Sequence, residues 1–265
     1  MAKFDIISAA GRAYQTSWSE RRYLLRLAAF PFLIKLVCLV LAGALAGDGN
    51  LLRFYLIMVP AYLAEGWMLS HYVRFLTLGQ RWPFRPSGDM DADMEQFAGR
   101  LRGVLSGMIV YTLINMGIGL FTAVAAYYLA PYMPSAANEE IAEVPAGIAL
   151  FSLLSIVFLF WGIRLLWLYV PFAMNQGARG YLHTLRGFNT SVYMIGLWLA
   201  CLLPFFMVLQ LAAALFAAPV AAAFGADAGN FVILFLTVIT ATLKGLVVTA
   251  GITYALNEIF TGKRS

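Results

Sequence analysis

Charged residues are scarce in this chain. They make up 12% of its 265 residues, whereas hydrophobic residues make up 62%. Soluble domains carry about 25% charged residues, so the composition excludes a soluble globular domain. Apolar runs recur along the whole length, and they leave no room for a separate extramembrane domain. We therefore expect an all-α, polytopic membrane helical bundle that forms one integral membrane domain over residues 1–265.

Residues and motifs with recognisable chemistry are also scarce. Cys38 and Cys201 lie inside apolar runs, without the CxxC or Cys/His spacing that a disulfide framework or a zinc site needs. The sequence contains no GxSxG, HExxH, P-loop or dinucleotide-binding motif. Its basic residues are scattered over short segments and form no run interleaved with aromatics. We expect no enzymatic activity, no metal, no cofactor and no nucleic-acid partner.

What the chain has in abundance is apolar runs near or above the ~20 residues that cross the hydrocarbon core of a bilayer. Their positions predict six transmembrane helices, at about 24–46, 52–77, 104–130, 146–172, 191–218 and 231–257.

The connecting segments differ in charge from one side to the other. Arginine and lysine concentrate before the first span, after the second, after the fourth and in the C-terminal tail, while the opposite connections carry mainly aspartate and glutamate. Cytoplasmic loops of membrane proteins are enriched in Lys and Arg. The pattern predicts a multi-pass protein with both termini in the cytoplasm, and the short loops favour a bacterial inner membrane.

Three segments on the basic side have helical hydrophobic spacing. Residues 1–22 are predicted to form an N-terminal amphipathic helix in the membrane interface, and two more such helices are predicted before the third and fifth spans. For each the alternative is that it simply begins the following span, and for the middle segment this interpretation is equally favoured. The apolar positions are Phe4, Ile7, Tyr14 and Trp18, then Met90, Met94, Phe97 and Leu101, then Tyr181, Leu185 and Phe188.

A few charges fall at membrane depth. Lys35 lies twelve residues before the turn at 47–50 and Glu65 fifteen residues after it, so an antiparallel hairpin brings them to depths within ~4 Å of each other. Lys244 reaches the same level in the last span and is a rival or third partner for the carboxylate. Arg164 lies near one end of the fourth span, between Trp161 and Trp167. These four residues form a candidate intramembrane charge network.

The network has two interpretations. A fixed ion pair would hold helices in register, with the mutual attraction offsetting desolvation. A titratable group in a proton or solute path is the functional alternative, because intramembrane charges are often functional. The first interpretation is favoured, since cations are available at the depth of Glu65.

The last span also carries small residues at intervals of four, which permit close helix approach. Packing within the bundle is favoured over an oligomer contact. The positions are Thr237, Ala241, Gly245, Thr249 and Thr253.

Two functions follow. The first is a non-enzymatic structural or accessory subunit that associates with itself or with a larger inner-membrane complex. The alternative is a small transporter or lipid-handling protein with a midplane charged site formed by Lys35, Glu65 and Lys244. Membrane lipids are partners in both.

Overall fold

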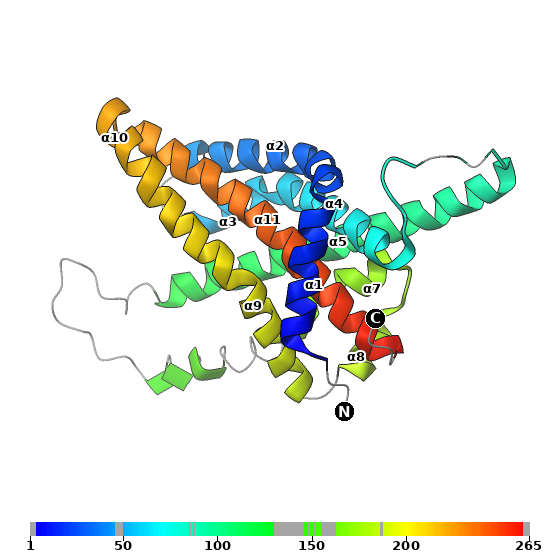
Figure 1. Ribbon diagram of the computed structural model, residues 1–265. Helices are drawn as coiled ribbons and strands as arrows, with labels where there is room; N and C mark the ends of the chain where they lie inside the picture. Colours follow the sequence, from blue (N-terminus) through cyan, green and yellow to red (C-terminus); the bar gives the residue numbers. More distant parts are fainter. Residues whose placement is uncertain are drawn as a thin grey trace.

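The computed structural model describes residues 4–45, 50–84, 86, 88–129, 146–147, 149–150, 152–154, 163–185 and 188–261. Helices dominate these residues, and no strand occurs among them (Figure 1). The helices are α1 (Ile6–Ser19), α2 (Arg21–Leu45), α3 (Leu51–Ile57), α4 (Val59–Leu78), α5 (Met90–Leu129), η2 (Ile163–Trp167), α7 (Tyr169–Ala173), α8 (Ala178–Thr184), α9 (Phe188–Ala212), η3 (Ala213–Ala217), α10 (Ala218–Phe224) and α11 (Ala226–Thr261).

Four helical segments of the described chain are long and apolar enough to cross a membrane. They are Arg21–Leu45, Met90–Tyr128, Asn189–Phe224 and Ala226–Phe260. They correspond to the first, third, fifth and sixth predicted spans. The all-helical architecture and these apolar helices agree with an integral membrane protein.

The second predicted span, 52–77, is not one continuous helix. It is divided into α3 and α4 at Met58, two residues before Pro60. Proline has no N–H to donate to the preceding turn, and its ring clashes with the carbonyl four residues earlier. The hydrophobic run is unbroken in the sequence, so hydropathy alone missed this interruption. The fourth predicted span, 146–172, lies partly outside the described residues, which leave out 148, 151 and 155–162, and η2 and α7 form its last part.

The middle amphipathic segment is not a separate helix. Its residues form the first turns of α5, which continues without a break from Met90 into the third predicted span. The equally favoured alternative was therefore correct for this segment. No proline interrupts it, and Asp89 accepts backbone hydrogen bonds from the first turn. The start of α5 extends away from the other helices (Figure 1).

The N-terminal helix α1 is a separate element that lies across α9 and α11 (Figure 1). Asp5 caps it by accepting the N–H of Ile7 at 3.0 Å. Tyr14 donates to the carbonyl of Cys201 at 2.9 Å, which joins α1 to α9. The predicted apolar stripe of this helix is partly buried and partly exposed. Phe4 is buried against the bundle, whereas Trp18 is 73% exposed.

The third amphipathic segment begins as the short helix α8, but its apolar side faces protein. Tyr181 and Leu185 are fully buried in the main core, and Phe188 begins α9. A stripe expected at the membrane interface is thus part of the protein interior. Helical periodicity reports an apolar face without saying whether lipid or protein covers it.

Glycine permits the close approach of α4 and α5. A Cβ built on Gly66 would lie 3.0 Å from both the Cα and the carbonyl oxygen of Met108. Few side-chain carbons pack that closely against backbone, so a side chain at position 66 would push the two helices apart by a few tenths of an ångström. This contact fixes the position of Glu65, the neighbouring residue on α4.

We predict that Gly66→Ala destabilises the protein by about 1–3 kcal/mol, as overpacking of a well-packed contact does. Thermal unfolding of the purified protein in mild detergent measures the effect. Gly43→Ala is the matched control, because a Cβ added to Gly43 in α2 would meet no atom within 4 Å. Equal unfolding midpoints for the two variants would contradict the close contact between α4 and α5.

Candidate functional site

The hairpin of α2 and α4 brings two opposite charges together. The Lys35 ammonium donates a hydrogen bond to the Glu65 carboxylate, with Nζ 2.8 Å from Oε2. Both side chains are largely covered by protein, with exposed fractions of 14% for Lys35 and 8% for Glu65. The pairing that antiparallel geometry favoured is thus present in the structure.

Helix α11 adds Lys244 to the same place. Lys35, Glu65 and Lys244 line one cavity of about 260 Å³. The next residue, Gly245, brings α11 close to α4, since a Cβ there would lie 3.3 Å from Oε1 of Glu65. No ion pair joins Lys244 to a described residue within 4.0 Å.

Helix α5 and the segment η2–α7 supply aromatic walls for this cavity. The rings of Tyr111 and Tyr169 meet edge to face, with centroids 5.3 Å apart. The Tyr169 hydroxyl lies 2.8 Å from that of Thr249 on α11, and Trp198 of α9 also lines the cavity. Asn115 lines it too, although its amide donates to the Tyr111 carbonyl of its own helix at 2.9 Å.

The cavity therefore carries two potential ammonium groups and one carboxylate. The carboxylate is engaged by Lys35, which leaves Lys244 as the surplus positive charge. An isolated charge at the centre of a membrane helix costs ~2.5–3.5 kcal/mol on insertion scales. The chemistry of this lining is suited to a negatively charged group, with tyrosine and threonine hydroxyls as further hydrogen-bonding partners.

Arg164 is the fourth member of the predicted network, and only its backbone is described. The backbone of Arg164 lies in η2, but its side chain is outside the part of the chain that the structure describes. Its expected neighbour Trp161 is also outside the described residues, whereas Trp167 is buried and lines the cavity.

The small-residue stripe of α11 lies mostly against protein. Ala241, Gly245 and Thr249 line the cavity. Thr253 is buried and donates to the Thr249 carbonyl at 2.7 Å. Thr237, at the other end, is exposed. Four of the five positions therefore lie toward the interior of the bundle, three of them on the wall of the cavity.

Sequence reasoning missed the aromatic lining of the cavity. Tyr111, Tyr169 and Trp198 lie in apolar runs that contain many other aromatics, and nothing local distinguishes them. They are distinguished only by their place in the folded chain, where each side chain lines the same cavity as Glu65. Comparisons of the chain with protein-family models, with curated proteins and with solved structures found no match.

We predict unequal effects from removing the two partners of the ion pair. Glu65→Gln leaves two ammonium groups without a carboxylate, and breaking a buried pair in this way costs about 3–5 kcal/mol. Lys35→Met leaves Glu65 beside Lys244, so its loss of stability is smaller. Unfolding midpoints of the purified variants in detergent test this order.

The control is Arg53→Gln, because Arg53 is exposed on α3. Its substitution changes the net charge by one unit, the same size of change as in Glu65→Gln but of opposite sign. A Lys35→Met variant that is as unstable as Glu65→Gln would contradict a role for Lys244 as the rival partner.

Proposed function

We propose that this protein is a non-enzymatic integral membrane protein that binds the anionic group of a small solute or lipid in the central cavity, as a small transporter or lipid-handling protein. The observation that carries the proposal is the position of Lys244, which lines the cavity beside a carboxylate already bonded to Lys35.

Charge balance supports binding of an anion. The cavity walls are largely apolar or aromatic, and electrostatic attraction is stronger in such surroundings than in water. A carboxylate or phosphate group offers acceptor oxygens to an ammonium and to nearby hydroxyls. In this proposal Glu65 positions Lys35 and prevents the two ammonium groups from repelling each other, so it has no catalytic part.

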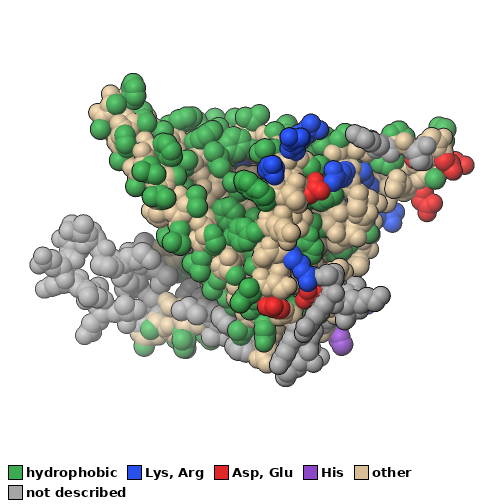
Figure 2. Space-filling view, viewed as in Figure 1, with side chains coloured by type: hydrophobic (Ala, Val, Ile, Leu, Met, Phe, Trp, Pro, Cys, Tyr) green, Lys and Arg blue, Asp and Glu red, His purple; other side chains and the backbone are tan. Residues whose placement is uncertain are grey.

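The proposed setting is the inner membrane of a bacterium, with both termini in the cytoplasm. On the face in Figure 2, Lys and Arg side chains gather over one half of the molecule, while hydrophobic side chains dominate the other half. Positive charge beside membrane spans favours the cytoplasmic side. This asymmetry supports the orientation that the loop charges predicted.

The accessory-subunit function stays a prediction. Its motivation was the lack of catalytic groups and of large loops, and its expected contacts were the interfacial helices and small-residue faces such as the stripe of α11. Most of that stripe is used within the bundle, which leaves it little capacity to bind another protein. Association with itself or with other membrane proteins would need a different surface.

We expect proteoliposomes that contain the parent chain to take up radiolabelled acetate or inorganic phosphate faster than protein-free liposomes. Lys244→Gln should lower this uptake about tenfold or more, because loss of a charge-assisted hydrogen bond in a buried site costs about 1.5–3 kcal/mol. Glu65→Gln should also lower uptake, because Lys35 loses the carboxylate that positions it. If the ligand is a lipid, native mass spectrometry should instead detect a bound anionic lipid that Lys244→Gln loses.

Arg53→Gln removes the same charge from an exposed position and should behave as the parent chain. The proposal fails if the parent and Lys244→Gln proteins show equal uptake and retain equal amounts of anionic lipid.

A further inference from the structure

A second cavity lies where α1 meets α2 and where the chain leaves α4. It has a volume of about 850 Å³, and five arginines line it together with one glutamate. The arginines are Arg21, Arg22, Arg26, Arg81 and Arg100. None of these residues takes part in the central cavity.

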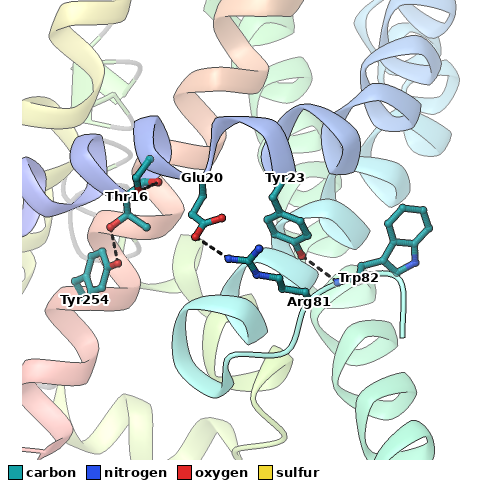
Figure 3. Close-up of polar contacts among 7 residues, drawn as sticks. Thr16, Glu20, Tyr23, Arg81, Trp82 and Tyr254 are labelled. Atoms are coloured by element: carbon teal, nitrogen blue, oxygen red, sulfur yellow. Dashed lines mark hydrogen bonds and ion pairs between the residues drawn. The ribbon is translucent and has the colours of Figure 1, made fainter. Parts of the chain in front are cut away.

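The glutamate of this pocket is already neutralised. Glu20 accepts a hydrogen bond from Arg81, with Nη2 2.7 Å from Oε1. Figure 3 shows the two side chains pointing toward each other, Glu20 from the junction of α1 and α2 and Arg81 from the segment after α4. Among the described residues no carboxylate lies within 4.0 Å of the other four arginines. The pocket therefore has a surplus of positive charge.

The wall of the pocket is held in place by specific contacts. Arg100 is buried and donates to the carbonyl of Arg81. The backbone N–H of Trp82 donates to the Tyr23 hydroxyl at 3.2 Å (Figure 3). The Trp82 ring packs edge to face on Trp67, with centroids 5.4 Å apart. Because these contacts hold the groups in position, the pocket loses little conformational freedom on binding a ligand.

An apolar groove begins where this pocket ends. It has a volume of about 540 Å³ and runs between α2 and α4, with Phe30, Ile34, Leu63 and Trp67 among its lining residues. Trp82 lines both the groove and the arginine pocket. The two hollows are thus neighbours, one basic and one apolar.

One face of α2 joins them. Arg22, Arg26, Phe30 and Ile34 follow at intervals of four and so lie in one row along the helix. The first two line the basic pocket and the last two line the groove. At 1.5 Å per residue the row is ~18 Å long, close to the ~15 Å between the edge and the midplane of the hydrocarbon core.

We propose that the pocket and groove together bind one anionic phospholipid, with its phosphate among Arg22, Arg26 and Arg100 and one acyl chain along Phe30 and Ile34. Guanidinium groups pair with phosphate oxygens through two parallel hydrogen bonds. Basic pockets between membrane helices recognise anionic headgroups. The adjoining apolar groove selects a lipid over free phosphate or an acidic peptide, because only the lipid fills both hollows.

The test uses the full chain, purified in mild detergent and mixed with equal amounts of phosphatidylglycerol and phosphatidylcholine. Native mass spectrometry should detect preferential binding of phosphatidylglycerol. Arg22→Gln/Arg26→Gln should reduce that preference about tenfold or more, since each surface arginine contributes appreciably to binding of anionic lipid. Both residues are exposed, so the fold should persist.

The control is Arg102→Gln/Arg179→Gln, which removes the same charge from two exposed positions that do not line the pocket. It should keep the parent preference. An equal loss in both double variants would mean general electrostatic attraction and would overturn the proposal, as would unchanged binding in Arg22→Gln/Arg26→Gln. Displacement of the lipid by inorganic phosphate alone would reduce the site to an anion pocket and would also overturn it.

A second measurement needs no change to the arginines. Phosphatidylglycerol with brominated acyl chains should quench the fluorescence of Trp82, and Trp82→Phe should lose that share of the quenching. Equal quenching by brominated phosphatidylcholine would contradict the proposal. Lys244→Gln should leave both results unchanged, so failure of this site and failure of the central cavity are distinguishable.

Discussion

Compensation of charge in a low-dielectric interior is the constraint on which this structure depends. Neither an ammonium nor a carboxylate is stable in hydrocarbon without an opposite charge or polar neighbours. The contact between Lys35 of α2 and Glu65 of α4 gives each of these charges an opposite charge as its neighbour. Gly66 and Gly245 then allow α5 and α11 to close around the pair, because a side chain at either position would meet a neighbouring helix. The charged pair and the close packing are therefore one arrangement.

The central cavity and the arginine pocket both carry an excess of positive charge. In the central cavity the surplus is a single ammonium among tyrosine and threonine side chains. In the arginine pocket the surplus is larger, and the side chains lie close to aromatic rings, including Arg81 over Phe75 at 5.0 Å. Confined positive charge next to an apolar surface is suited to amphiphilic anions, which bring charge and hydrocarbon together.

Particular residues mark where sequence reasoning succeeded and where it stopped. Lys35 and Glu65 could be paired in advance, since a hairpin with a known turn relates depth to residue number at 1.5 Å per residue. Hydropathy did not predict the break at Met58 or the continuity of α5 from Met90. A hydropathy value is an average over a window of residues, so it does not register a single proline such as Pro60 or individual glycines. Tyr181 and Leu185 were assigned to an interface because periodicity describes a helix face and not its neighbour.

The sequence by itself determined the all-helical, strongly apolar architecture and the pairing of Lys35 with Glu65, because these depend on composition and on spacing along one chain. The tertiary structure alone decided that Lys244 shares a cavity with the pair, that Tyr111 and Tyr169 line it, and that Trp82 joins a basic pocket to an apolar groove. Those relations join helices that are distant in sequence. They depend on the rotation and separation of packed helices, which no local pattern of residues specifies.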